Sequence, residues 1–252
     1  KNINKDMAIK FMQNNNIRQL PVVDNNNKIT DLYFLDKLSS FKKKKNLVMI
    51  MAGGMGTRLK PYTDNCPKPM LPVAGKPILE HIIERTKAEG FNNIVISTYY
   101  LGHMIENYFG NGNKWKVNIS YTHEKKPLGT AGAISLISKF PTEPFIVING
   151  DVLTDIQYSK ILDFHIRNES IATMAVRQYE MQHQFGVVQT KGIDIIGFEE
   201  KPIIRNHINA GVYVLNPLVK NYLKHDQLPL NFFLVYQFLF LLENSFFQYF
   251  YQ

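Results

Sequence analysis

Residues 47–59 read Leu-Val-Met-Ile-Met-Ala-Gly-Gly-Met-Gly-Thr-Arg-Leu, and this stretch decides the fold. The run 47–51 is almost continuously apolar, as expected of a strand that is buried on both faces of a parallel sheet. The segment 52–59, which we call the glycine loop, follows it. Glycines let backbone N–H groups surround an anion, and Arg58 adds a planar fork suited to phosphate oxygens. The glycines alone are equally compatible with a tight turn that binds nothing.

Two familiar phosphate-binding motifs do not fit this loop. A dinucleotide fingerprint needs a third glycine where Leu59 stands. A P-loop needs Gly-Lys followed by Ser or Thr, but Gly75-Lys76 is followed by Pro77.

The rest of the chain alternates between strand-like and helix-like segments. We expect strands at 93–98, 117–121, 145–148 and 171–177, and helices at 77–89, 103–109, 130–138 and 158–168. This alternation predicts an α/β fold with a Rossmann-like, mostly parallel sheet. Ligands of such sheets bind beyond the carboxyl ends of the strands, so the loops after Met51 and Ile148 are the candidate sites.

A long motif follows the first strand. Residues 53–73 read G-G-M-G-T-R-L-K-P-Y-T-D-N-C-P-K-P-M-L-P-V. This run resembles the signature G-G-x-G-T-R-L-x-P-x-T-x-x-x-P-K-P of the sugar-nucleotide pyrophosphorylases, and its length and order make it specific. The prolines beside Lys68 stiffen its backbone and direct its ammonium into the site. The resemblance implies a GT-A-like nucleotidyltransferase fold with Arg58 and Lys68 as catalytic residues.

Other segments resemble elements of the same family in the same order. The run 124–132, E-K-K-P-L-G-T-A-G, resembles the loop and helix start that contact nucleoside and sugar in this family. The resemblance implies nucleotide-binding roles for Ala52, Gly53, Gly54, Gly56, Thr57, Gly129 and Thr130.

The metal and sugar sites are implied in the same way. Asn149-Gly150-Asp151 resembles the family's G-D element, whose aspartate binds Mg²⁺, and a carboxylate at a strand end is a suitable hard ligand. The run 198–202, F-E-E-K-P, resembles the family's E-E-K-P element, which implies that Glu200 contacts sugar hydroxyls and Lys201 the sugar phosphate. The run 209–213, N-A-G-V-Y, resembles its N-A-G-x-Y strand, which implies that Asn209 contacts the sugar.

The implied reaction is attack of a sugar 1-phosphate oxygen on the α-phosphorus of a nucleoside triphosphate, with pyrophosphate leaving. The nucleophile is already an anion, so no general base is needed. The run 127–132 looks most like mannose-1-phosphate guanylyltransferases and their relatives. It favours GTP with a hexose, heptose or hexosamine 1-phosphate, in sugar-nucleotide and polysaccharide biosynthesis.

Residues 1–41 are expected to form a separate α+β unit. The pattern predicts a helix at 6–13, strands at 17–23 and 29–34, and a short helix from Leu35, followed by a linker at 42–46. Residues 12–24, M-Q-N-N-N-I-R-Q-L-P-V-V-D, resemble the second half of a CBS motif. Such motifs work in pairs and often bind adenine nucleotides. A packing appendage is the alternative.

The tail of the predicted nucleotidyltransferase domain, 47–252, has an anomalous composition. Residues 226–252 hold seven of the 17 phenylalanines and no Lys or Arg. They lack the W-x-D-I-G element, whose aspartate is the family's second metal carboxylate. A frame-shifted or truncated end is the favoured explanation, ahead of divergence and lost catalysis. It predicts weak activity and aggregation through the tail. The alternative function is a non-catalytic, nucleotide-sensing regulatory subunit.

The composition of the chain argues against nucleic acid and membrane as partners. The net charge is +8, but no interleaving of basic and aromatic residues indicates nucleic-acid binding. The longest apolar stretch, 232–242, is far shorter than the ~20 residues of a membrane-spanning helix. One cysteine and no secretory signal favour the cytoplasm. The oligomeric state is left open, with a homo-oligomer among the alternatives.

Overall fold

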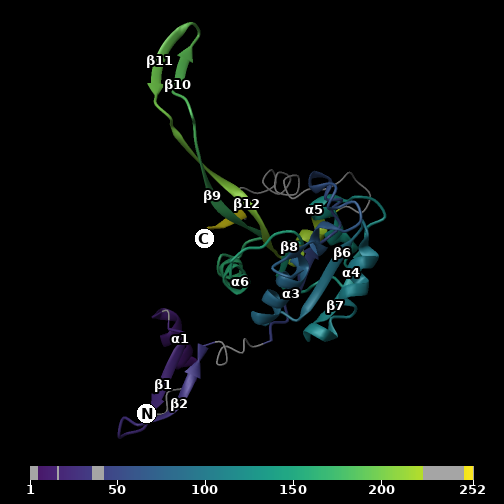
Figure 1. Ribbon diagram of the computed structural model, residues 1–252, viewed down its shortest axis with the longest axis vertical. Helices are drawn as coiled ribbons and strands as arrows, with labels where there is room; N and C mark the ends of the chain where they lie inside the picture. Colours follow the sequence, from purple (N-terminus) through teal and green to yellow (C-terminus); the bar gives the residue numbers. More distant parts are fainter. Residues whose placement is uncertain (1–4, 16, 36–42, 224–246, 252) are drawn as a thin grey trace.

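The computed structural model describes residues 5–15, 17–35, 43–223 and 247–251, and Figure 1 shows their arrangement. A seven-stranded sheet with the order β13-β9-β12-β8-β3-β6-β7 forms the centre. Its strands are β3 (Val48–Met51), β6 (Asn93–Thr98), β7 (Asn118–His123), β8 (Phe145–Asn149), β9 (Ala172–Gln182), β12 (Ile203–Leu215) and β13 (Phe247–Tyr251). Four of the neighbouring pairs are parallel, and the two that involve β12 are antiparallel. The predicted α/β fold with a mostly parallel sheet is therefore confirmed.

Both faces of the central strands are buried. Val48 and Ile50 of β3 pack into one apolar cluster with the helices α3 (Ile78–Ala88), α4 (Gly102–Phe109) and α6 (Tyr158–Arg167). Met49 packs into a second cluster with the 3₁₀ turns η4 (Ala133–Leu136) and η5 (Pro217–Tyr222). Successive side chains of a strand point to opposite faces, so an unbroken apolar run at 48–50 is what this double burial requires.

The segment that follows β8 is fastened to the end of α3. The carboxylate of Glu89 accepts hydrogen bonds from the backbone N–H groups of Tyr158 and Ser159, at 3.1 and 2.7 Å, and so caps the start of α6. Arg85 donates to the carbonyl oxygens of Thr154 and Ile156. These contacts fix the path of the chain just after Asp151.

Two parts of the domain differ from the expected pattern. The helix expected at 130–138 is divided into α5 (Gly129–Gly132) and the 3₁₀ turn η4, where the Ser135 hydroxyl donates to the Gly132 carbonyl oxygen at 2.7 Å. Such local bonds from serine compete with regular helix. β9 was expected to end at 177 but continues to Gln182, because it pairs with β12 beyond the edge of the sheet.

This extension ends in a hairpin of β10 (Val187–Lys191) and β11 (Asp194–Glu199). We call residues 177–208 the arm. Figure 1 shows the arm projecting well beyond the sheet, with the hairpin at its far end. Short elements complete the domain: η1 (Thr57–Leu59), η2 (Lys68–Met70), β4 (Pro72–Val73), β5 (Lys76–Pro77) and η3 (Asn113–Trp115).

The N-terminal unit has the expected order of helix, strand and strand. α1 (Lys5–Asn14) is followed by an antiparallel pair, β1 (Gln19–Val23) and β2 (Ile29–Phe34). Asp24 shapes the turn between them, because its carboxylate accepts from the backbone N–H groups of Asn26 and Lys28. All of the helix expected from residue 35 except Leu35 itself, and most of the anomalous tail, lie outside the described residues. Within the described ranges, no helix is long and apolar enough to cross a membrane.

Candidate active site

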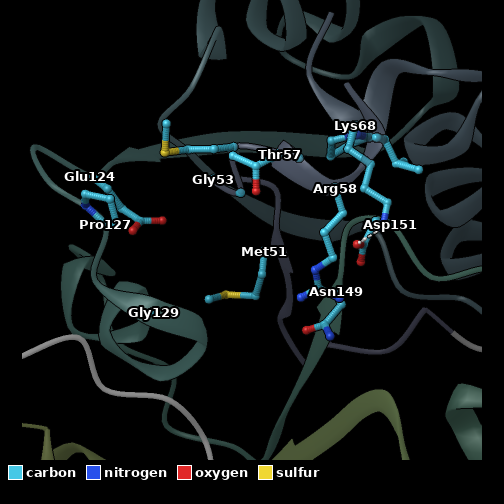
Figure 2. A pocket seen from close by; sticks show the side chains of 15 residues that line it. Met51, Gly53, Thr57, Arg58, Lys68, Glu124, Pro127, Gly129, Asn149 and Asp151 are labelled. Atoms are coloured by element: carbon cyan, nitrogen blue, oxygen red, sulfur yellow. Dashed lines mark hydrogen bonds and ion pairs between the residues drawn. The ribbon is translucent and has the colours of Figure 1, made fainter. Parts of the chain in front are cut away.

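A cavity of about 630 Å³ opens at the carboxyl ends of β3, β7 and β8, where the topology of the sheet predicts a ligand. Figure 2 shows it from close by. Its lining comes from the glycine loop, from η2, and from the segments that follow β7 and β8. The lining residues are Met51, Gly53, Gly54, Met55, Gly56, Thr57, Arg58, Leu59, Lys68, Pro69, Glu124, Pro127, Gly129, Asn149 and Asp151.

The glycine loop lies close to neighbouring residues at two of its glycines. Gly56 has a φ of 63°, and a Cβ added there would stand 2.9 Å from Cγ2 of Thr63. A Cβ on Gly53 would stand 2.5 Å from Oε1 of Glu124. A Cβ on Gly54, in contrast, would meet no protein atom within 4 Å. The loop is therefore packed against its neighbours at positions 53 and 56 and open at position 54.

Lys68 and Asp151 meet in the cavity although 83 residues separate them. Nζ of Lys68 lies 2.6 Å from Oδ2 of Asp151, and the two side chains are 34% and 35% exposed. Pro67 precedes η2 and Pro69 is buried within it, so the backbone around Lys68 is stiff, as the sequence predicts. Asp151 lies in the turn that follows β8. Figure 2 shows this ion pair as a dashed line.

Arg58 supplies a second positive charge. It lies in η1, and Figure 2 shows its side chain reaching into the cavity in the direction of Asn149. No carboxylate forms an ion pair with Arg58 among the residues that the structure describes. Its guanidinium is thus available to an anionic ligand.

Glu124 is a cavity residue that the sequence analysis placed in a nucleoside loop without naming it as a site residue. Its Oε1 accepts from the Ser97 hydroxyl and its Oε2 from the Leu128 N–H, both at 2.9 Å. These bonds tie the loop 125–128 to the end of β6. The position of Glu124 just after β7, at the same sheet edge as the glycine loop, was the available signal.

Asn149 was missed as well. It ends β8 two residues before Asp151, and its Oδ1 is buried without a hydrogen-bond partner in the described part of the chain. A Cβ on Gly211 would stand 3.0 Å from its Nδ2, so the amide packs against β12.

The structure brings most of the expected nucleotide and catalytic residues together. Gly53, Gly54, Gly56, Thr57, Arg58, Lys68, Gly129 and Asp151 all line the cavity. Ala52 is not among the lining residues, because it is buried and donates its N–H to the Ser97 carbonyl oxygen at 2.9 Å. Thr130 follows Gly129 in α5.

The three expected sugar-phosphate residues do not line the cavity. Asn209 Oδ1 accepts from the Gly211 N–H at 2.8 Å, and its Nδ2 donates to the Tyr213 hydroxyl at 2.5 Å. Burial raises the pKa of Tyr213, so this hydroxyl stays protonated. Glu200 and Lys201 lie exposed on the arm. The six residue steps from Ile203 to Asn209 along β12 place them about 20 Å or more from Asn209.

The cavity suits a magnesium ion that enters together with phosphates. Asp151 offers a carboxylate at a strand end, and Oδ2 is engaged by Lys68. No three His, Cys, Asp or Glu side chains group into a metal site in the described ranges. Mg²⁺ keeps several waters and is usually held by one or two carboxylates plus substrate phosphates, so one protein carboxylate is a fitting donor set.

Several known proteins resemble this chain. The model of the nucleotidyl transferase family matches residues 47–231. The mannose-1-phosphate guanylyltransferase catalytic subunit beta of Xenopus tropicalis is 36% identical over 179 residues, 68% of this chain and 50% of that protein. A UTP–glucose-1-phosphate uridylyltransferase of Synechocystis is 33% identical over 198 residues, 71% of this chain and 51% of that protein. The chain spans about half the length of the curated relatives it matches.

A solved structure is similar in fold as well as in sequence. The structure of HddC from Yersinia pseudotuberculosis complexed with GMP-PN superposes with a TM-score of 0.62 and 26% identity. The match covers 82% of this chain and 90% of that one.

Proposed function

The chain belongs to the nucleotidyl transferase family, and on that premise we propose that it joins a nucleoside triphosphate to a sugar 1-phosphate and releases pyrophosphate. The main support for the proposal is that Arg58, Lys68 and Asp151 line one cavity together with the glycine loop. Cations and open backbone N–H groups suit a polyphosphate, and the carboxylate suits the metal ion that accompanies it.

In this reaction an oxygen of the sugar phosphate attacks the α-phosphorus, and the bond from that phosphorus to the bridging oxygen of pyrophosphate breaks. Both reactants are anions, so the site must supply positive charge and alignment. Arg58 and Lys68 line the cavity and neutralise charge on the triphosphate. Asp151 would hold Mg²⁺, which when bound adds further positive charge at the phosphates. Proton transfer is not needed, because the attacking oxygen carries a negative charge already.

Glu124 supports GTP as the nucleotide. Each of its oxygens accepts one hydrogen bond from the protein, and an ionised carboxylate has about four lone-pair sites, so both oxygens can accept another. Guanine presents two adjacent donors, N1–H and the N2 amino group, which a carboxylate accepts together. Uracil and thymine present a single ring N–H. Guanylyltransferases and a uridylyltransferase all resemble this chain, so the preference for GTP rests on the run 127–132 and on Glu124.

The sugar side of the proposal depends on the arm. Glu200 and Lys201 would contact a hexose, heptose or hexosamine 1-phosphate only if the arm bends toward the cavity, whereas Asn209 lies near the end of β8 already. If the arm bends in this way, Lys201→Ala raises the KM for the sugar phosphate and leaves the affinity for the nucleotide unchanged. An unchanged KM would remove Lys201 from the proposed site.

We also propose that the N-terminal unit is half of a CBS-type pair that binds an adenine nucleotide. Its helix, strand and strand in the expected order support this. We further propose that the protein acts in the cytoplasm and takes part in sugar-nucleotide synthesis.

Pyrophosphate release tests the function. Four nucleoside triphosphates are combined with mannose, glucose and glucosamine 1-phosphates and Mg²⁺. We expect release with GTP and one sugar phosphate, and its loss in Lys68→Ala and Asp151→Ala. Lys60→Ala is the matched control, because Lys60 forms a surface ion pair with Asp64 at 3.3 Å. Nucleotide binding without release from any pair would instead favour the nucleotide-sensing regulatory subunit.

A further inference from the structure

The Lys68–Asp151 ion pair joins two groups that the proposed reaction uses separately. Nζ lies 2.6 Å from Oδ2, a short contact of the charge-assisted kind. In the proposed reaction the ammonium belongs on the phosphates and the carboxylate belongs on the metal ion. In the structure the two groups pair with each other, whereas the proposed reaction pairs the ammonium with phosphates and the carboxylate with metal.

The backbones on both sides of the pair are fixed. Lys68 lies in η2 between two prolines, and its Cβ would be 3.4 Å from a Cβ added to Gly56. Asp151 follows Gly150, where an added Cβ would stand 2.8 Å from the Met51 carbonyl oxygen. The pair can open only through rotation of side-chain bonds, and the four-carbon stem of lysine provides most of that freedom.

The ammonium competes with a divalent ion for the same carboxylate. Mg²⁺ binds carboxylate oxygen at about 2.0–2.1 Å, so a metal ion on Oδ2 would stand beside Nζ, and the two cations would repel each other. Within the described residues no group of three His, Cys, Asp or Glu side chains offers the ion a site elsewhere. The nucleotide-free cavity thus favours the ammonium over the metal ion.

We propose that Lys68 is a built-in counter-ion that keeps divalent metal off Asp151 until the phosphates of a nucleotide draw the ammonium away. The proposal rests on the proposed function in taking the incoming ligand to be a nucleoside triphosphate. A triphosphate carries several negative charges and competes well with a single carboxylate for lysine. Metal and nucleotide then bind as a coupled pair, and each raises the affinity of the other by the same factor.

Mn²⁺ binding in the absence of nucleotide tests whether Lys68 keeps divalent metal off Asp151. Mn²⁺ accepts carboxylate and water ligands as Mg²⁺ does, and its free hexaaqua form is counted by electron paramagnetic resonance. We expect Lys68→Met and Lys68→Gln to bind Mn²⁺ about tenfold or more tightly than the wild type, because the competing charge is gone. The surface control Lys60→Met should bind as the wild type does, and adding Asp151→Asn to Lys68→Met should remove the gain. Equal binding by wild type and both Lys68 variants, or a gain that survives Asp151→Asn, would overturn the proposal.

Addition of a non-hydrolysable GTP analogue tests whether the phosphates of a nucleotide draw the Lys68 ammonium away from Asp151. The analogue should raise the Mn²⁺ affinity of the wild type about tenfold or more, and should raise that of Lys68→Met by a smaller factor. Equal factors in the two chains, or no rise in the wild type, would contradict release by the nucleotide. The nucleotide-free comparison contains no substrate of the proposed reaction, so its result separates failure of the counter-ion from failure of the proposed function.

Discussion

Substitution of Gly53 by alanine should destabilise the ligand-free protein, whereas the same change at Gly54 should not. A Cβ at position 53 would stand 2.5 Å from Oε1 of Glu124 and 3.3 Å from Cβ of Tyr99. At position 54 it would meet nothing within 4 Å, and neither glycine has a positive φ. The two neighbouring residues therefore form a matched pair that differs only in the space beside each Cα.

The cost at position 53 follows from the contacts of Glu124. Ordinary van der Waals contact begins near 3.4 Å, so Oε1 must move by about 1 Å, which breaks or badly stretches its 2.9 Å bond from the Ser97 hydroxyl. A hydrogen bond to a charged group contributes about 1.5–3 kcal/mol, and the partial exposure of Glu124 places the loss near the lower figure. Alanine restricts the unfolded chain equally at both positions and adds about 0.4–1 kcal/mol of stability. The two variants should thus differ by about 1.5 kcal/mol.

Thermal unfolding followed by circular dichroism measures this difference. For a chain of this size about 1 kcal/mol shifts Tm by roughly 2–4 °C, so we expect Gly53→Ala to melt about 3–6 °C below Gly54→Ala. The clash with Glu124 is tested by repeating the Gly53 substitution in a Glu124→Ala background, where it should cost much less. Equal melting temperatures of the two single variants, or an undiminished cost in that background, would show that the Gly53–Glu124 contact does not limit stability.

Three further outcomes follow from buried and exposed side chains. Glu89→Ala removes the acceptor of the Tyr158 and Ser159 N–H groups and should lower the free energy of unfolding, measured in urea, by about 2 kcal/mol. A loss below about 0.5 kcal/mol would contradict the capping role. Burial lowers the pKa of His165 from 6.5 to about 4. Between these pH values the unfolded chain binds a proton that the folded chain does not, so the free energy of unfolding should fall by up to about 3 kcal/mol as the pH drops from 6.5 to 4. His165→Gln should flatten that part of the pH profile of unfolding, and an unchanged slope would disprove the assignment. Ile193→Lys should leave Tm within about 1 °C of the wild type because Ile193 is 100% exposed, and a larger fall would reveal a hidden contact.

The sequence predicted best the elements that are buried on regular faces. The strand expected at 93–98 is β6 with the same bounds, and the strands expected at 47–51 and 145–148 differ from β3 and β8 by one residue each. β2 also has its expected bounds, 29–34, although most of it is exposed. Apolar periodicity carries this information because burial on one or both faces imposes it. The extension of β9 to Gln182 has no such pattern, since the strand leaves the core and pairs only with β12.

The candidate site was predictable where its residues form one continuous motif. Arg58 and Lys68 lie in a single run of sequence, and Asp151 follows a strand whose burial was evident. Glu124 and Asn149 were missed because their roles depend on residues far away in the sequence. Ser97 precedes Glu124 by 27 positions, and Gly211 packs on Asn149 from β12.

The most direct test of the central claim follows the α-phosphorus itself. GTP labelled at that phosphorus is incubated with Mg²⁺ and mannose 1-phosphate or another sugar 1-phosphate from the panel, and the products are separated. We expect the label to appear in a nucleoside-diphosphate sugar and label placed on the γ-phosphorus to appear in pyrophosphate. Lys68→Ala should form neither product. Label found only in GTP, or γ-label released as inorganic phosphate, would contradict nucleotidyl transfer by this cavity.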